Sequence, residues 1–213
     1  MDRSAVILAG GSSAKFEGDK GVSVLNGKPL IRYVFDAVAG LVDEVVFVVC
    51  SQARADLYAK VLSPEVKFVV EDYEAKGTLV GAAAGFQAAK GNYTALLPFD
   101  SPYVSTEVMS LLFDCAIGKA ADIPRSTDMQ CQPLHAVYHT KQALEAAQEA
   151  LAEDEFDVEA MVDRLRGVRY MSLMVIEQLD PDLKTFFTVR TPFELKQAAV
   201  MGKTRKTSKT KKF

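Results

Sequence analysis

The sequence predicts an α/β fold, a three-layer sandwich in which helices cover both faces of a mostly parallel β-sheet. Apolar segments of strand length alternate with helix-length segments through residue 117, which is typical of consecutive βαβ units. The segment 44–50 is apolar and β-branched almost throughout, as expected of a parallel strand that is buried on both faces.

The first half of the chain contains four expected strand–helix pairs. Strand-length apolar runs occupy residues 5–8, 44–50, 66–70 and 93–98. Each precedes a segment with helical character, and these lie at residues 29–41, 52–61, 78–90 and 106–117. Pro29 opens the first helix, because proline is tolerated in a first helical turn.

After residue 120 the pattern changes to shorter elements. We expect strands at 121–125 and 133–138 around a polar segment, and later strands at 168–173 and 186–189. Amphipathic helices are expected at 142–152 and 158–165, and a last helix begins at Thr191-Pro192.

Length and composition fit one domain. The chain has 213 residues, of which 49% are hydrophobic and 25% charged, enough to build a sizeable core. We expect a single domain over 1–199 and a basic, disordered tail over 200–213, which carries six lysines and arginines and no acid. Binding of nucleic acid or an acidic partner by this tail is the less favoured alternative, since no aromatic residue interleaves its charges.

Location is indicated by what the chain lacks. Its longest apolar runs are of strand length, so we expect no membrane span, and the opening residues do not resemble a signal peptide. Three widely separated cysteines do not suggest a disulfide framework. These observations predict a cytoplasmic protein, and they leave the oligomeric state open.

A glycine-rich loop follows the first strand, at residues 8–20. Parallel sheets bind ligands at this edge. Gly10 and Gly11 allow backbone N–H groups to approach an anion closely, while Lys15 and Lys20 add positive charge. The loop fits neither the P-loop nor the dinucleotide fingerprint. It predicts a cradle for a nucleoside triphosphate, and the alternative is a tight turn with two solvated lysines.

An aspartate follows the fourth expected strand. Asp100 would lie at the same edge as the glycine loop, where it could hold Mg²⁺ together with substrate phosphates. The alternative is that Asp100 caps the next helix. Further along the same edge, glycines recur at 77, 81 and 85. Gly77 and Gly81 could approach a ligand or serve close packing, whereas packing is the favoured interpretation for Gly85.

Two histidines four residues apart do not predict a metal site. His135 and His139 lie in an expected strand, and no third ligand is spaced to complete a zinc site. We therefore disfavour zinc binding.

These motifs together resemble the molybdenum cofactor guanylyltransferases, a family of NTP-dependent nucleotidyltransferases. The resemblance covers residues 5–199 in the correct order and rests on the motifs at 8–20, 27–30, 77–81, 97–102, 132–138 and 188–192. It implies a Rossmann-like fold of the nucleotide-diphospho-sugar transferase type. It also implies GTP and a phosphorylated acceptor, molybdopterin, as substrates, Mg²⁺ as cofactor, and protein partners for cofactor delivery.

The resemblance also implies roles for individual residues. Lys20, Lys15 and Asp100 would be catalytic, and Asp100 would hold the metal. The nucleotide would contact Leu8, Ala9, Gly10, Gly11, Ser12, Ser13, Lys20, Asp72, Gly77 and Gly81.

The chain departs from the family pattern at several positions. Lys15 stands where the family usually has arginine, and Lys lacks the planar fork that grips a phosphate through two bonds. Thr188 and Arg190 replace the two asparagines of the closing motif. The hypothesis is transfer of GMP from GTP to molybdopterin. Alternatives are CTP as donor, a sugar phosphate, phospholactate or cobinamide phosphate as acceptor, and a nucleotide-binding protein without turnover.

Overall fold

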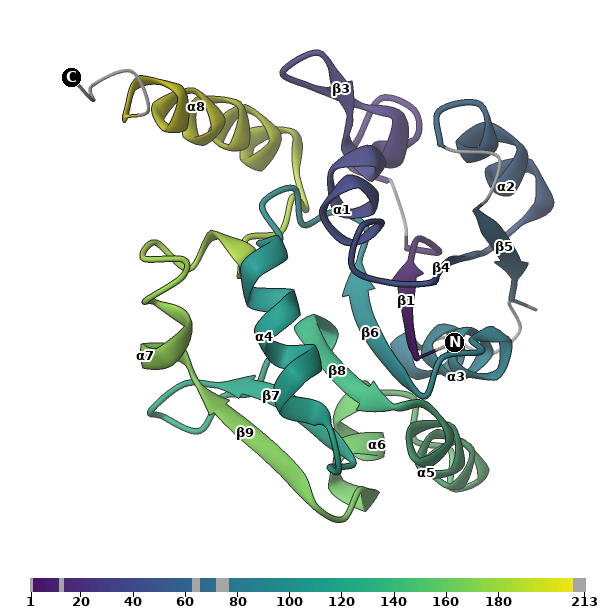
Figure 1. Ribbon diagram of the computed structural model, residues 1–213. Helices are drawn as coiled ribbons and strands as arrows, with labels where there is room; N and C mark the ends of the chain where they lie inside the picture. The colour runs from purple at the N-terminus through teal and green to yellow at the C-terminus, as the bar shows by residue number, and fades with distance from the viewer. Residues whose placement is uncertain (1, 12–13, 63–65, 72–76, 209–213) are drawn as a thin grey trace.

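A seven-stranded sheet organises the molecule (Figure 1), with strands in the order β5-β4-β1-β6-β8-β7-β9. The computed structural model describes residues 2–11, 14–62, 66–71 and 77–208. The strands of this sheet are β1 (Arg3–Leu8), β4 (Glu44–Val49), β5 (Lys67–Val70), β6 (Tyr93–Pro98), β7 (Ala121–Arg125), β8 (Ala136–His139) and β9 (Val168–Ser172).

The helices follow the strands closely in the chain. They are α1 (Leu30–Val38), α2 (Gln52–Ala59), α3 (Thr78–Ala88), α4 (Thr106–Ala116), α5 (Thr140–Ala152), α6 (Val158–Arg164), α7 (Leu173–Ile176) and α8 (Pro192–Ser208). Short 3₁₀ turns lie at η1 (Lys20–Val22), η2 (Pro133–His135) and η3 (Lys184–Phe186).

The pairing of the strands confirms the predicted mostly parallel sheet. β1 lies between β4 and β6 and is parallel to both, and β5 is parallel to β4. β8 runs antiparallel to β6 and β7, and β9 is parallel to β7. The carboxyl ends of β1, β4, β5 and β6 therefore meet at one edge of the sheet, as the sequence motifs require.

Two apolar cores flank the sheet, which is the three-layer arrangement expected. Alternate residues of β1 show this division. Ile7 belongs to the core shared with α1, α2 and α4, whereas Val6 belongs to the core shared with α3, α5 and α6. Both side chains are fully buried, so the central strand is covered on both faces.

A small hairpin was not expected from the sequence. It joins β2 (Val24–Leu25) to β3 (Lys28–Pro29) through Asn26 and Gly27, whose φ angles are +47° and +85°. Asn-Gly is the strongest short-range signal for such a tight turn. The strands have two residues each, too short to show an alternating pattern.

The expected strand at 186–189 is wrong. Its start lies in the 3₁₀ turn η3, and only its last residue makes a strand-like contact, with the Val189 N–H donating to the Asp100 carbonyl at 2.8 Å. The expected strand at 133–138 begins instead with the turn η2, and pairing starts at Ala136.

The last helix is longer than expected. The predicted boundary at 199 falls within α8, which continues to Ser208 and projects from the body of the molecule (Figure 1). The Asn26 side chain attaches its middle to the hairpin by donating to the Ala199 carbonyl at 3.2 Å. Tyr103, in the loop between β6 and α4, donates to the Ala198 carbonyl. Residues 200–208 are thus helical, and the division into domain and tail stays a prediction.

Membrane insertion by a helix finds no support in the described ranges. No helix within residues 2–11, 14–62, 66–71 and 77–208 is long and apolar enough to cross a bilayer.

Gly85 brings α3 against the sheet, which confirms packing as its role. A methyl group at this position would lie 2.3 Å from Val6 Cγ1 and 3.2 Å from Val48 Cγ2. Both valines are buried in neighbouring strands, so they cannot move aside freely.

Gly85→Ala is therefore expected to destabilise the protein, although alanine is the better helix former. Overpacking of this kind costs about 1–3 kcal/mol, which exceeds the gain of about 1 kcal/mol in helix propensity. Denaturant unfolding measures the difference. Gly40→Ala is the control, because no atom lies within 4 Å of the added methyl group. Equal stability of the two variants would contradict tight packing at Gly85.

Asp122 is a fully buried carboxylate in β7. Neither of its carboxylate oxygens has a hydrogen-bond partner among the described residues. Burial raises the pKa of Asp122 to about 6, although the nearby Arg169 acts in the opposite direction. Because the folded state binds this proton more tightly than the unfolded state, stability is lost as pH rises between about 4 and about 6.

Asp122→Asn is expected to raise stability above pH 6 by up to about 3 kcal/mol, the free energy equivalent to the raised pKa. The gain over the wild type shrinks as pH falls toward 4, where Asp122 is neutral in both states. Unfolding measured from pH 4 to pH 8 tests this. Asp163→Asn is an exposed control that should show no such trend, and a pH-independent gain for Asp122→Asn would sink the explanation.

Candidate active site

A cavity of about 610 Å³ opens at the carboxyl edge of the sheet. Its walls come from the ends of β1, β4 and β6, from the start of α3, and from segments 131–135 and 186–190. The predicted site residues that line it are Leu8, Gly10, Gly11, Lys20, Gly77, Gly81 and Asp100. The structure thus brings together motifs that are far apart in the sequence.

Not every predicted residue reaches this cavity. Lys15 is exposed and is not among the lining residues. Ala9 is buried, and its N–H extends the β1 ladder by donating to the Val48 carbonyl at 2.7 Å, so that N–H is already engaged. Ser12, Ser13 and Asp72 lie outside the described residues. Their predicted roles, like the others in this site, stay predictions.

Arg54 of α2 fixes the start of the glycine loop. Its Nη1 donates to the carbonyls of Gly10 and Gly11, at 3.0 Å each. Its Nε forms an ion pair with Asp19 Oδ2 at 3.0 Å, at the far end of the loop. Because the guanidinium engages carbonyl oxygens on one side of the loop, it holds the backbone in one orientation. No sequence pattern indicates this contact, which links residues more than 40 positions apart.

Asp19 continues this network toward the core. Its Oδ1 accepts from the Gly21 N–H at 2.7 Å and from the Tyr58 hydroxyl at 2.8 Å. Burial and the hydrogen bond to Asp19 raise the pKa of Tyr58 well above its usual value. A methyl group at Gly21 would lie 2.6 Å from the Tyr58 hydroxyl oxygen, so glycine is required for this close approach.

Lys20 and Asp100 form the charged centre of the cavity. Lys20 Nζ lies 2.5 Å from Asp100 Oδ2, and their side chains are only 8% and 13% exposed. The ammonium also lies 4.8 Å from the centre of the Phe99 ring, a favourable cation–π position. The prediction that the first loop and Asp100 lie at one edge is therefore supported by a direct contact.

The buried residues Ser101 and His135 hold the loop that carries Asp100. The next residue, Ser101, is fully buried, and its Oγ lies 2.9 Å from His135 Nε2. Burial lowers the pKa of His135 to about 3, so its imidazole is neutral near pH 7. The histidine packs edge-on against Phe186. Segments 131–135 and 186–190 are thereby attached to the aspartate that they surround.

The two candidate ligand glycines differ in their surroundings. A methyl group at Gly77 would lie 2.4 Å from Phe156 Cβ, which indicates close packing as well as a place in the cavity wall. A methyl group at Gly81 would lie 2.7 Å from Glu71 Oε2. Glu71 lines the cavity too, although the sequence patterns did not single it out.

Metal binding would depend on substrate oxygens. Within the described ranges, no three His, Cys, Asp or Glu side chains cluster in a way that could hold an ion. The two histidines for which zinc binding was disfavoured make other contacts, and His135 Nε2 lies 2.9 Å from Ser101 Oγ. His139 instead accepts from the Gln142 N–H at the start of α5. A single carboxylate with substrate phosphates remains a usual way to hold Mg²⁺.

The fold and this cavity define an α/β protein built to bind a nucleotide at the carboxyl edge of its sheet. Residues 5–168 match the model of the MobA-like NTP transferase domain. The chain belongs to this family and is a nucleotidyltransferase, as the resemblance implied.

Curated relatives agree with this assignment. A probable molybdenum cofactor guanylyltransferase of Haloferax mediterranei is 33% identical over 84% of this chain and 80% of its own length. A probable molybdenum cofactor guanylyltransferase of Methanosarcina mazei is 29% identical over 91% and 88%. The fold is also that of the molybdopterin-guanine dinucleotide biosynthesis protein A from Archaeoglobus fulgidus, with a TM-score of 0.79 at 24% identity, covering 94% of this chain and 99% of that one.

Arg54→Lys is expected to loosen the glycine loop. Lysine keeps the charge beside Asp19 but cannot also reach the loop carbonyls in a planar fork. Losing hydrogen bonds to a charged donor costs about 1.5–3 kcal/mol, and we expect nucleoside triphosphate affinity to fall roughly tenfold or more. Calorimetric titration measures this.

Arg32→Lys is the matched control. Arg32 lies on α1 and pairs with Asp36, away from the lining residues. If Arg54→Lys bound triphosphate as tightly as this control, Arg54 would have no part in shaping the loop.

Proposed function

We propose that this protein transfers GMP from GTP to the terminal phosphate of molybdopterin and releases pyrophosphate. The observation that carries this proposal is the Lys20–Asp100 pair beside the glycine loop in one cavity. It supplies the two charges that phosphoryl chemistry needs, a cation for phosphate oxygens and a carboxylate for a divalent ion. The names of the curated relatives support GTP and the molybdenum cofactor as substrates.

Binding of the triphosphate begins at Gly10 and Gly11. Their backbone lies beyond the last ladder contact of β1, and their carbonyls are held by Arg54. The N–H groups of this segment are thus available to phosphate oxygens. Lys20 turns from Asp100 toward the β- and γ-phosphates, and Lys15 adds charge from the exposed part of the loop. Ser12 and Ser13 lie outside the described residues, and their contacts with the nucleotide stay predictions.

Asp100 is the residue that would hold Mg²⁺. Its carboxylate lines the cavity and is kept in place by the buried Ser101–His135 contact. One carboxylate suits this ion when phosphate oxygens supply further ligands. When bound, the ion supplies positive charge that neutralises the α-phosphate during transfer.

The reaction itself needs little covalent help from the protein. An oxygen of the acceptor phosphate forms a bond to the α-phosphorus of GTP. The bond from that phosphorus to the bridging oxygen of the β-phosphate breaks, and the electron pair leaves with pyrophosphate. The attacking phosphate is already ionised near pH 7, so no general base is required. Lys20 stabilises the charge that accumulates on the leaving group.

The acceptor approaches from the other side of Asp100. Segments 131–135 and 186–190 form that wall of the cavity, and Arg190 is the cation on it, well suited to a phosphate monoester. The placement explains how a chain with arginine in place of asparagine in its closing motif can still bind an anionic acceptor. A cytoplasmic location, protein partners for cofactor delivery and a role for Asp72 beside the nucleotide stay predictions.

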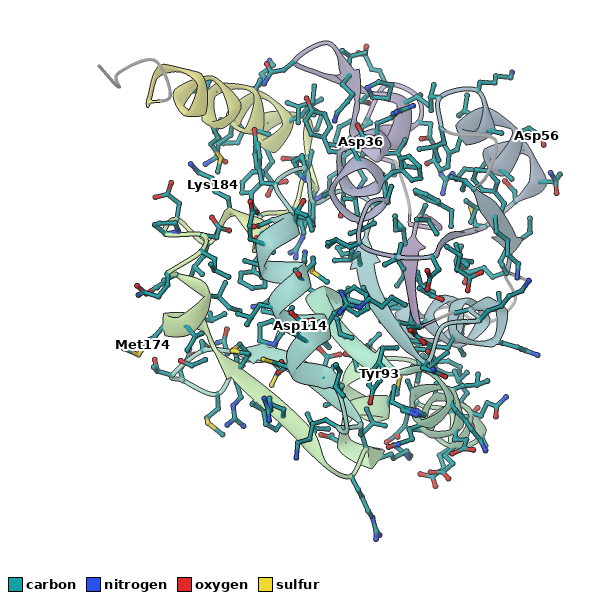
Figure 2. All side chains as sticks on the ribbon, viewed as in Figure 1. Asp36, Asp56, Tyr93, Asp114, Met174 and Lys184 are labelled. Atoms are coloured by element: carbon teal, nitrogen blue, oxygen red, sulfur yellow. The ribbon has the colours of Figure 1, made fainter. Side chains whose placement is uncertain are left out.

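Asp100→Asn is expected to reduce pyrophosphate release by at least roughly 100-fold, since an amide oxygen is a poor substitute for a metal-binding carboxylate. The assay supplies GTP, Mg²⁺ and molybdopterin, and repeats the reaction with CTP and with a sugar phosphate as acceptor. Asp56→Asn is the control, because Asp56 points outward from α2 (Figure 2). Undiminished turnover with unchanged Mg²⁺ dependence would exclude Asp100 as the metal ligand. No pyrophosphate release from any wild-type pairing would overturn the proposed enzyme.

A further inference from the structure

Glu71 is a half-buried acid at the end of β5. Its carboxylate occupies a gap between the first loop and α3, where two glycines face it. A methyl group at Gly10 would lie 2.7 Å from Oε1, and one at Gly81 would lie 2.7 Å from Oε2. Either side chain would therefore displace the carboxylate from the cavity wall that it helps to form.

The carboxylate is incompletely satisfied. Its Oε2 atom is buried and has no hydrogen-bond partner among the described residues. Burial raises the pKa of Glu71, since the charged form loses water there. An acceptor left unpaired in this way is destabilising, and a rotation of the carboxylate toward the cavity would let two N–H donors of a ligand remove that cost.

The position of Glu71 determines which part of a nucleotide can reach it. In the sheet, β6 is the direct neighbour of β1 on one side. On the other side β4 comes first and β5 lies beyond it. Lys20 and Asp100 lie at the β6 side, so the triphosphate belongs there. Glu71 faces Gly10 on the side where a Cβ would stand, and a phosphate on that side would be repelled. The nucleoside must therefore extend toward β5, where the cavity wall includes Leu8 and Val48, apolar side chains suited to a flat base.

We propose that Glu71 selects the base by accepting hydrogen bonds from two adjacent N–H groups, those of N1 and the 2-amino group of guanine. This inference rests on the proposed function and deepens it by assigning a specificity residue. Guanine is the base that presents two neighbouring donors on one edge. Adenine and cytosine place a ring acceptor beside their amino group, and uracil places carbonyls on both sides of its N–H, so each brings an acceptor against the carboxylate.

The test is a set of binding measurements on the full chain without acceptor, so that selectivity is read apart from turnover. Wild-type protein is titrated calorimetrically with GTP, inosine triphosphate (ITP), xanthosine triphosphate (XTP) and ATP. ITP lacks the 2-amino group, and XTP carries a carbonyl in its place. We expect GTP to bind roughly tenfold more tightly than ITP and at least roughly 100-fold more tightly than XTP and ATP, as for paired hydrogen bonds to a base edge.

Glu71→Gln reverses part of this selectivity, because its amide can donate to the xanthine carbonyl. We expect GTP affinity to fall roughly 10- to 100-fold while XTP affinity is retained or rises, so the ratio of GTP affinity to XTP affinity falls by at least roughly tenfold. Glu177→Gln is the matched control on the exposed end of α7 and should keep the wild-type ratios. Thermal melting confirms that each variant is folded.

Glu71→Asp is the second variant, needed if Glu71→Gln does not fold. It retracts the carboxylate by one methylene and should lower the GTP:ITP ratio toward one. If the folded variants kept the wild-type ratios of triphosphate affinity, the assignment of Glu71 would be overturned while the proposed function stayed intact. Wild-type protein that binds none of the four triphosphates would overturn both. Wild-type protein that binds all four equally would reject base selection by Glu71 alone.

Discussion

Lys20 and Asp100 are 80 residues apart in the chain, and their 2.5 Å ion pair joins the loop after β1 to the loop after β6. Neighbouring parallel strands bring the two loops to one edge, but the pair also needs each loop to adopt one shape. Desolvation of two largely buried charges is costly unless their geometry is good. Several other contacts of the site can be understood as means of fixing that geometry.

On the Lys20 side, the geometry comes from Arg54 and Asp19. The guanidinium holds the start of the loop, and the carboxylate caps the 3₁₀ turn that begins at Lys20. Tyr58 anchors Asp19 from within the apolar core. The orientation of the Lys20 ammonium, the proposed phosphate ligand, therefore depends on a buried aromatic side chain of α2, a helix that contributes no residue to the cavity wall. Fold stability and ligand binding are physically coupled through this one chain of contacts.

The sequence predicted the parallel sheet and the candidate site residues that directly follow its strands. It did not predict residues that reach the cavity or its loops through their side chains from elsewhere in the fold. Gly10, Gly11 and Asp100 follow strands directly, so strand order alone places them. Arg54 and Glu71 carry no such signal, since an arginine on a helix and an acid after a strand are common on any surface. The apolar run at 186–189 predicted a strand for a related reason. Its phenylalanines pack against His135 and Tyr103, and packing of aromatic side chains gives the same pattern as strand pairing.

Asp122 and Glu71 show that an unpaired carboxylate can either only destabilise the fold or also line a cavity. Asp122 and Glu71 each have at least one buried carboxylate oxygen without a partner in the described part of the chain. Asp122 lies in β7 and lines no part of the large cavity, so a ligand there cannot compensate its burial, which the nearby Arg169 offsets only in part. Glu71 lies in the cavity wall, opposite the cationic end, with glycines at the two positions where a side chain would close the gap. That arrangement polarises the cavity, because phosphate is attracted to one end and repelled from the other. Under the proposed function, a nucleotide with a charged tail and N–H donors on its base would bind in only one direction, which would present its α-phosphate to the acceptor side of Asp100.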